Sequence, residues 1–254
     1  MTSPSSPWAD TPCELITTPQ YATNKEDIFT VGATHMAHIH NAIIRGYNSI
    51  YLQAPHVADA DKPAFVGYAL TWFRFVKAHH DDEENELFPA ISRVLHDEKI
   101  WGETHKEHEY STYLTSLPTP TSLNGTHLQS LMSAFQPTFS QHFHSEIATL
   151  AAFSSHPSTP VPGTPDADAA ATVFKTWGKK TIMKAGVWDV VPFFLMNIDG
   201  GYEGGRWREW PPMPAPVRWG LLNVAGSWRA SEWRFASCDG WGNRRGLWAL
   251  QGKE

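Results

Sequence analysis

Two segments of this chain repeat one small pattern, a histidine followed four residues later by a glutamate, at His79/Glu83 and at His142/Glu146. Residues i and i+4 lie on one face of an α-helix, so each pair can present an imidazole nitrogen and a carboxylate oxygen to the same point. Donors of these two types, without a thiolate, bind iron, manganese or zinc. The pattern therefore predicts a metal centre between helices.

A further histidine stands upstream of each pair at a comparable distance. Four helices would then donate His, His/Glu, His and His/Glu inward, which is how a helix bundle builds a two-metal carboxylate site. We predict a non-haem centre of two iron ions, with manganese and zinc ranked behind iron. The predicted ligands are His40, His79, Glu83, His108, His142 and Glu146.

The second of these helices carries a competing register. His80 and Glu84 have the same spacing as His79 and Glu83, and each pair shares a face with apolar residues. The segment around His142 places histidine, glutamate and leucine at four-residue steps. The His79/Glu83 register repeats that order, and we therefore prefer it.

On the first helix, His40 shares a face with apolar residues and is expected to point into the core. His38 falls with Asn41 and Arg45 on the opposite face, which we expect to meet solvent. On the third helix, periodicity alone leaves the choice between His105 and His108 open.

Prolines and hydrophobic periodicity divide the chain into segments. Four prolines and little periodicity predict an N-terminal arm over residues 1–25. Helices are predicted over residues 27–53, 62–95, 101–117 and 123–153, with Pro89 and Pro137 as kinks or breaks. We therefore predict an all-α, up-and-down four-helix bundle over residues 26–155.

The composition changes after residue 155. Residues 156–170 are rich in Pro, Ser, Thr and Asp and predict a linker. Residues 171–254 hold nine of the chain's 12 tryptophans among many glycines and prolines. We predict an irregular, short-stranded C-terminal extension that packs its tryptophans on the bundle.

Charge and composition exclude several classes of function. A net charge of −6 and a pI near 6.1 give no basic surface for nucleic acid. The sequence shows no signal peptide and no apolar run that could span a membrane. The two cysteines, Cys13 and Cys238, form no CxxC metal or redox motif. We expect a cytoplasmic protein that binds neither nucleic acid nor membrane.

The ordered motifs resemble the hemerythrin-like family, also called the HHE cation-binding family, and in particular its fungal members. The resemblance rests on HHDDEENELFP, HFHSEIATL, HNAIIRGYNSIYLQAP and THKEHEYSTYL, and it covers about residues 27–153. It implies an up-and-down four-helix bundle with a non-haem di-iron centre, and it favours His108 over His105. The extension is similar to those found on some of these proteins.

The number of histidines bears on function. Oxygen-carrying members of the family use five histidine ligands, whereas four fall into place here, with His80, His105 and His144 as candidates for a fifth. This difference favours O2 activation over reversible oxygen carriage. We expect an O2-dependent oxidoreductase that acts on a small organic substrate, and the sequence nominates no catalytic side chain. The alternatives are a non-catalytic protein that binds, stores or senses O2, NO or iron, and a structural module that binds a protein partner.

Overall fold

The computed structural model describes residues 7–101 and 110–251 of the chain. These residues form helices joined by loops, and the one β-type pairing among them is an isolated bridge between Cys238 and Arg244. The prediction of an all-α protein is confirmed. The predicted ligand His108 and its rival His105 lie outside the described residues.

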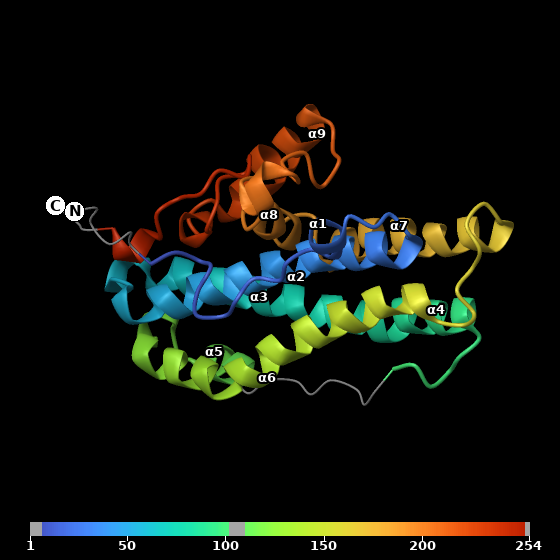
Figure 1. Cartoon of the computed structure of the whole chain (residues 1–254). Helices are drawn as coiled ribbons and strands as arrows, with labels where there is room; N and C mark the ends of the chain where they lie inside the picture. The colour runs from blue at the N-terminus through green and yellow to red at the C-terminus, as the bar shows by residue number, and fades with distance from the viewer. Residues whose placement is uncertain (1–6, 102–109, 252–254) are drawn as a thin grey trace, which may run out of the picture.

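Four long helices carry most of the core of the described structure (Figure 1). They are α2 (Ile28–Gln53), α3 (Lys62–Asp82), α6 (Gly125–Ala152) and α7 (Pro165–Ala185). α2 packs against each of the other three, and α3 also packs against α7. As a result, α2 is buried along most of its length. No helix within the described ranges is both long enough and apolar enough to cross a bilayer.

Side-chain caps fix where two of these helices begin. Asp27 accepts a hydrogen bond from the Thr30 N–H at the start of α2, and Asn124 accepts one from the His127 N–H at the start of α6. Such caps satisfy N–H groups that have no partner within the helix. Both helices lie within two residues of the predicted 27–53 and 123–153.

The second predicted helix is interrupted near the expected break. α3 ends at Asp82, the π-helical turn η3 covers Glu83–Leu87, and α4 covers Phe88–Leu95. The Phe88 N–H donates to the Glu83 carbonyl, five residues back. Pro89 follows at once, and a proline ring would clash with the carbonyl four residues before it in an unbroken α-helix. The break is therefore a π-helical turn that begins at a predicted metal ligand.

The described part of the third predicted helix is α5 (Tyr110–Ser116). It packs against α3 and α6. Residues 102–109 of the predicted segment lie outside the described ranges.

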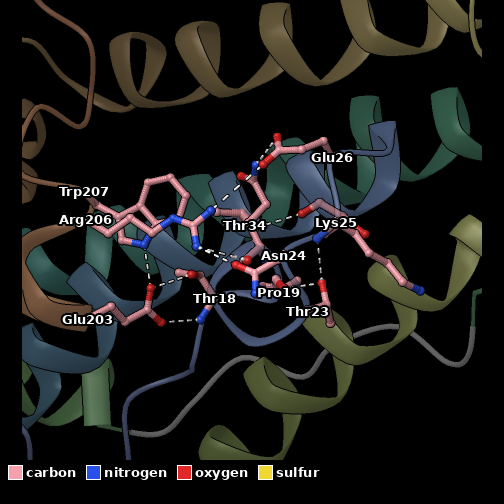
Figure 2. A network of polar contacts seen from close by, with 12 residues as sticks. Thr18, Pro19, Thr23, Asn24, Lys25, Glu26, Thr34, Glu203, Arg206 and Trp207 are labelled. Carbon is pink, nitrogen blue, oxygen red and sulfur yellow. Dashed lines mark hydrogen bonds and ion pairs between the residues drawn. The ribbon is translucent and has the colours of Figure 1, made fainter.

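The N-terminal arm, which includes α1 (Pro19–Thr23), is fixed to α2 and to the extension. The side-chain oxygen of Asn41 accepts a hydrogen bond from the Ile16 N–H at 2.7 Å. Figure 2 shows the second attachment, where the Thr18 N–H and hydroxyl both donate to the Glu203 carboxylate at 2.6 Å. The arm is thus part of the fold.

The predicted character of the extension is wrong in part. α7 begins inside the predicted linker, because Thr164 caps the Ala167 N–H and Pro165 occupies the first turn. Two shorter helices follow, α8 (Val190–Leu195) and α9 (Ala215–Gly220). No strand occurs in the described part of residues 171–254. The Gly- and Pro-rich composition predicts irregular structure, whereas local caps and an alanine-rich run form a helix.

The extension shares one apolar core with the long helices. Phe193 of α8 is fully buried, and its ring lies 4.8 Å from the Tyr68 ring and 6.2 Å from the Phe75 ring, both on α3. The prediction that the extension packs its tryptophans on the bundle is wrong in part, because Trp188, Trp219 and Trp228 are each more than half exposed.

Candidate metal centre

α2 and α3 bring three predicted ligands to one point. His40 Nε2 lies 3.0 Å from His79 Nε2 and 3.7 Å from a Glu83 carboxylate oxygen. His79 Nε2 lies 2.8 Å from the same oxygen. One donor atom from each of these side chains lies within 4.8 Å of the other two, and all three residues are buried. Donors that surround one ion at about 2.0–2.2 Å must lie this close to one another.

α6 adds a second carboxylate to the cluster. A Glu146 oxygen lies 3.8 Å from His40 Nε2 and 3.5 Å from His142 Nε2. The side chain of Glu146 is 5% exposed, whereas that of His142 is 19% exposed. His142 therefore marks the edge of the cluster that is nearest to solvent. Five of the six predicted ligands are brought together, and His108 is not described.

Burial dominates the electrostatics of the cluster. It raises the pKa of the Glu83 carboxyl well above its usual value, and burial together with the Glu83 charge does the same for Glu146. It also lowers the pKa of His40 well below its usual value, an effect that the neighbouring imidazoles increase. Within the described ranges, no lysine or arginine forms an ion pair with either carboxylate. A bound cation would supply the positive charge that ionised carboxylates need here.

The π-helical turn helps to set this geometry. Glu83 is its first residue and follows His79 by one turn of α3. Glu83 is fully buried, whereas Glu84 is half-buried. Of the two registers that the sequence allows, His79/Glu83 is therefore the one that faces the cluster.

The two described candidates for a fifth histidine ligand differ in position. The His80 ring lies 5.2 Å from the His142 ring, at the border of the cluster. His144 instead makes a hydrogen-bond contact of 3.2 Å with the Glu14 carbonyl in the N-terminal arm. His80 is thus the nearer candidate.

The chain as a whole is similar to a known protein. No family model matches the sequence, and no solved structure matches the fold. A relative from Cryptosporiopsis sp. (strain 8999), the "dimeric xanthone biosynthesis cluster protein R11", is 30% identical over 255 residues, which cover 94% of this chain and 92% of that protein. The chain belongs to the family of that protein. Since the match covers 94% of this chain, it includes at least part of the N-terminal arm and most of the extension as well as the helices that carry the cluster.

In this member of the family, α7 also borders the cluster. The Trp177 ring lies 5.8 Å from the His79 ring, and the Phe143 ring lies 4.3 Å from the His40 ring. Trp177 is absent from the predicted site because its segment is predicted to be irregular. The available signal is a buried stripe with helical spacing, formed by Ala170, Phe174, Trp177 and Thr181.

A second prediction, that the opposite face of α2 meets solvent, is wrong. His38, Asn41 and Arg45 are expected to meet solvent, but all three are buried. The His38 ring stacks on the Trp210 ring at a centroid distance of 4.4 Å, and burial lowers the pKa of His38 to about 3. The arm and the extension cover this face. His38 is accordingly held away from the cluster by a partner of its own.

Proposed function

We propose that this protein is a hemerythrin-like, non-haem di-iron protein that activates O2 to oxidise a small organic substrate. The observation that carries the proposal is the buried group of His40, His79 and Glu83, with Glu146 beside it. Neutral imidazole and carboxylate together suit iron better than copper(I) or an iron–sulfur cluster. The donor set therefore fits the proposed metal.

The packing of the helices supports a hemerythrin-like bundle. α2 packs against α3, α3 against α5, α5 against α6, and α6 against α2. These contacts join four helices in a ring, in which the described α5 lies beside the start of α6, where the Tyr113 hydroxyl contacts Asn124. In the proposed bundle, the third helix would also supply His108, which precedes α5.

Iron bound here would supply O2 binding and one-electron redox chemistry. The chain's own residues would hold the ions and shape their surroundings. His40 and His79 would hold the ions through Nε2, and the Glu83 and Glu146 carboxylates would balance the charge of the ions. Phe143 and Trp177 lie against the histidine rings and would exclude water from that side.

The family supports an aromatic substrate. The related protein's name places it in a cluster for the biosynthesis of dimeric xanthones, and xanthones contain aromatic rings. We propose that the substrate of the present chain is likewise an aromatic intermediate of a biosynthetic route. The reaction would be an oxidation by O2.

Metal analysis together with an optical spectrum tests the proposal. We expect two irons per chain and an absorption band of ferric iron that appears when the anaerobically reduced protein meets air. Incubation of the reduced protein with O2 and a candidate aromatic substrate should then yield an oxidised product. A reversible oxygen spectrum without product would instead identify an oxygen carrier or sensor. One zinc, or no metal with an unchanged melting temperature, would overturn the di-iron assignment.

A further inference from the structure

A groove of about 310 Å³ lies beside the proposed metal centre, between α7 and the chain from η3 to α4. α4 and α7 pack against each other along this side of the molecule (Figure 1). The groove has the size of the smaller ligand sites in proteins. It is lined by Asn85, Glu86, Leu87, Ala90, Arg93, Val173, Thr176, Trp177 and Lys180.

The floor of the groove is apolar and aromatic. Leu87 and Trp177 are buried, and Val173 is half-buried beside them. The indole N–H of Trp177 is buried and has no hydrogen-bond partner within the described ranges. Trp177 is 6% exposed, so a flat apolar ring would contact the part of the indole that faces the groove and the half-buried side chain of Val173.

The rim of the groove is positively charged. Arg93 and Lys180 are exposed, and neither forms an ion pair with a described residue within 4.0 Å. Lys184 lowers the pKa of the Glu86 carboxyl, and Lys180 lies near enough to that carboxyl to add to the effect. Glu86 is the acidic residue of the lining, but its carboxylate is bound by Lys184, which also contacts Asp82 at 3.2 Å. The remaining charge at the rim therefore favours an anion, and an arginine fork binds a carboxylate in a bidentate manner.

The groove and the metal cluster share structural elements. Trp177 lines the groove and also lies against the His79 ring, at a centroid distance of 5.8 Å. η3 begins with Glu83 and continues into the lining residues Asn85 to Leu87. A ligand in the groove would thus be one side chain away from the cluster.

We propose that this groove binds a small aromatic carboxylate, with its ring against Val173 and Trp177 and its carboxylate between Arg93 and Lys180. As the assignment of the substrate site, this inference rests on the proposed function; as a binding site, it stands on the groove alone. A neutral aromatic ligand would leave the two cations unused, and a small inorganic anion would leave the aromatic floor uncovered.

Isothermal titration calorimetry with 2-naphthoate tests the site in the full-length protein as isolated, with the metal content measured on the same sample. We expect 2-naphthoate to bind and its neutral analogue 2-naphthamide to bind at least tenfold more weakly. The double variant R93Q/K180Q should lose affinity by about tenfold or more, since hydrogen bonds to charged groups contribute this much. The matched double variant K99Q/K175Q removes the same charge from exposed positions outside the lining and should bind as the parent does.

The outcomes separate this inference from the proposed function. Binding of 2-naphthoate that depends on Arg93 and Lys180 in a metal-free protein would keep the groove and reject the di-iron proposal. Two irons per chain without binding of 2-naphthoate would refute the groove as a binding site. Binding that R93Q/K180Q leaves unchanged would refute it as well. A W177F variant gives an independent check, because loss of the indole N–H and of part of the floor should also weaken binding while Arg93 and Lys180 remain.

Discussion

The replacement of Glu83 by glutamine separates a metal ligand from a structural acid, because the two roles predict opposite effects. Glutamine has nearly the same shape as glutamate and keeps one carbonyl oxygen that can accept from the His79 side chain, 2.8 Å away. It removes the negative charge of a fully buried carboxylate. The change therefore tests the charge and not the volume of the side chain.

In the metal-loaded protein, Glu83→Gln should abolish much of the stabilisation by metal. A ligand that binds only the folded state stabilises it by about 2.7 to 4.1 kcal/mol at 100 to 1,000 times its dissociation constant. For a chain of this size, about 1 kcal/mol corresponds to 2–4 °C in Tm. We therefore expect the parent to gain about 5–15 °C in Tm on metal loading, and the variant to gain only a small part of that.

In the metal-free protein, the same change should be neutral or stabilising. The variant exchanges a charge-assisted hydrogen bond for a neutral one, which costs about 1 kcal/mol. It also removes the cost of burying a carboxylate with no lysine or arginine beside it, which is several kcal/mol when the group is ionised. The second effect is at least as large as the first, so the Tm of the metal-free variant should equal or exceed that of the metal-free parent.

Scanning calorimetry of both proteins, before and after removal of metal by a chelator, measures both quantities. Glu84→Gln is the matched control, because Glu84 is the next residue and belongs to the competing register. It should leave the metal content unchanged. A Glu83→Gln protein that loses as much Tm without metal as with it would refute the assignment of Glu83 as a ligand, and loss of metal only in Glu84→Gln would reverse the register.

Three further substitutions probe the cluster and its supports. His142→Ala should lower the iron content from two toward one per chain by elemental analysis, and unchanged stoichiometry would remove His142 from the ligand set. His38→Ala should keep the metal but lower the free energy of unfolding by about 2–3 kcal/mol, since it truncates a buried, stacked ring; loss of metal would mean that the ligand on α2 is His38 and not His40. Asn48→Ala removes hydrogen bonds to the backbone of the buried arm. It should lower the free energy of unfolding, measured with urea, by about 3 kcal/mol, since each buried group left without a partner costs roughly 1–3 kcal/mol. A cost under about 1 kcal/mol would mean that the arm adds little to stability.

The helices that carry the cluster were predictable because local signals agreed with one another. Asp27 and Asn124 are strong N-caps, and Pro89 marks the break after η3. The His79/Glu83 and His142/Glu146 pairs follow from helical spacing, and the structure places both at one cluster. Four-residue spacing on an apolar helix face thus predicts which donor side chains come together.

The covered face of α2 could not be predicted in the same way. Asn41, Arg45 and Asn48 have the composition of a solvated face, but their hydrogen bonds go to backbone groups far away in the chain. Asn48, for example, donates to the Ala9 and Cys13 carbonyls at 3.1 and 2.8 Å. A polar side chain that bonds to buried backbone and one that bonds to water look the same in a periodicity argument, so tertiary structure alone distinguishes them.

The metal cluster and the extension depend on the same helix. At Gly46 of α2, an added Cβ would lie 2.6 Å from the Trp72 ring and 2.7 Å from the Phe193 ring, so α3 and α8 both approach the helix backbone there. Six residues earlier, which is less than two turns, the same helix presents His40 to the cluster. Because close packing transmits small displacements, a shift of α8 would be felt at the ligand.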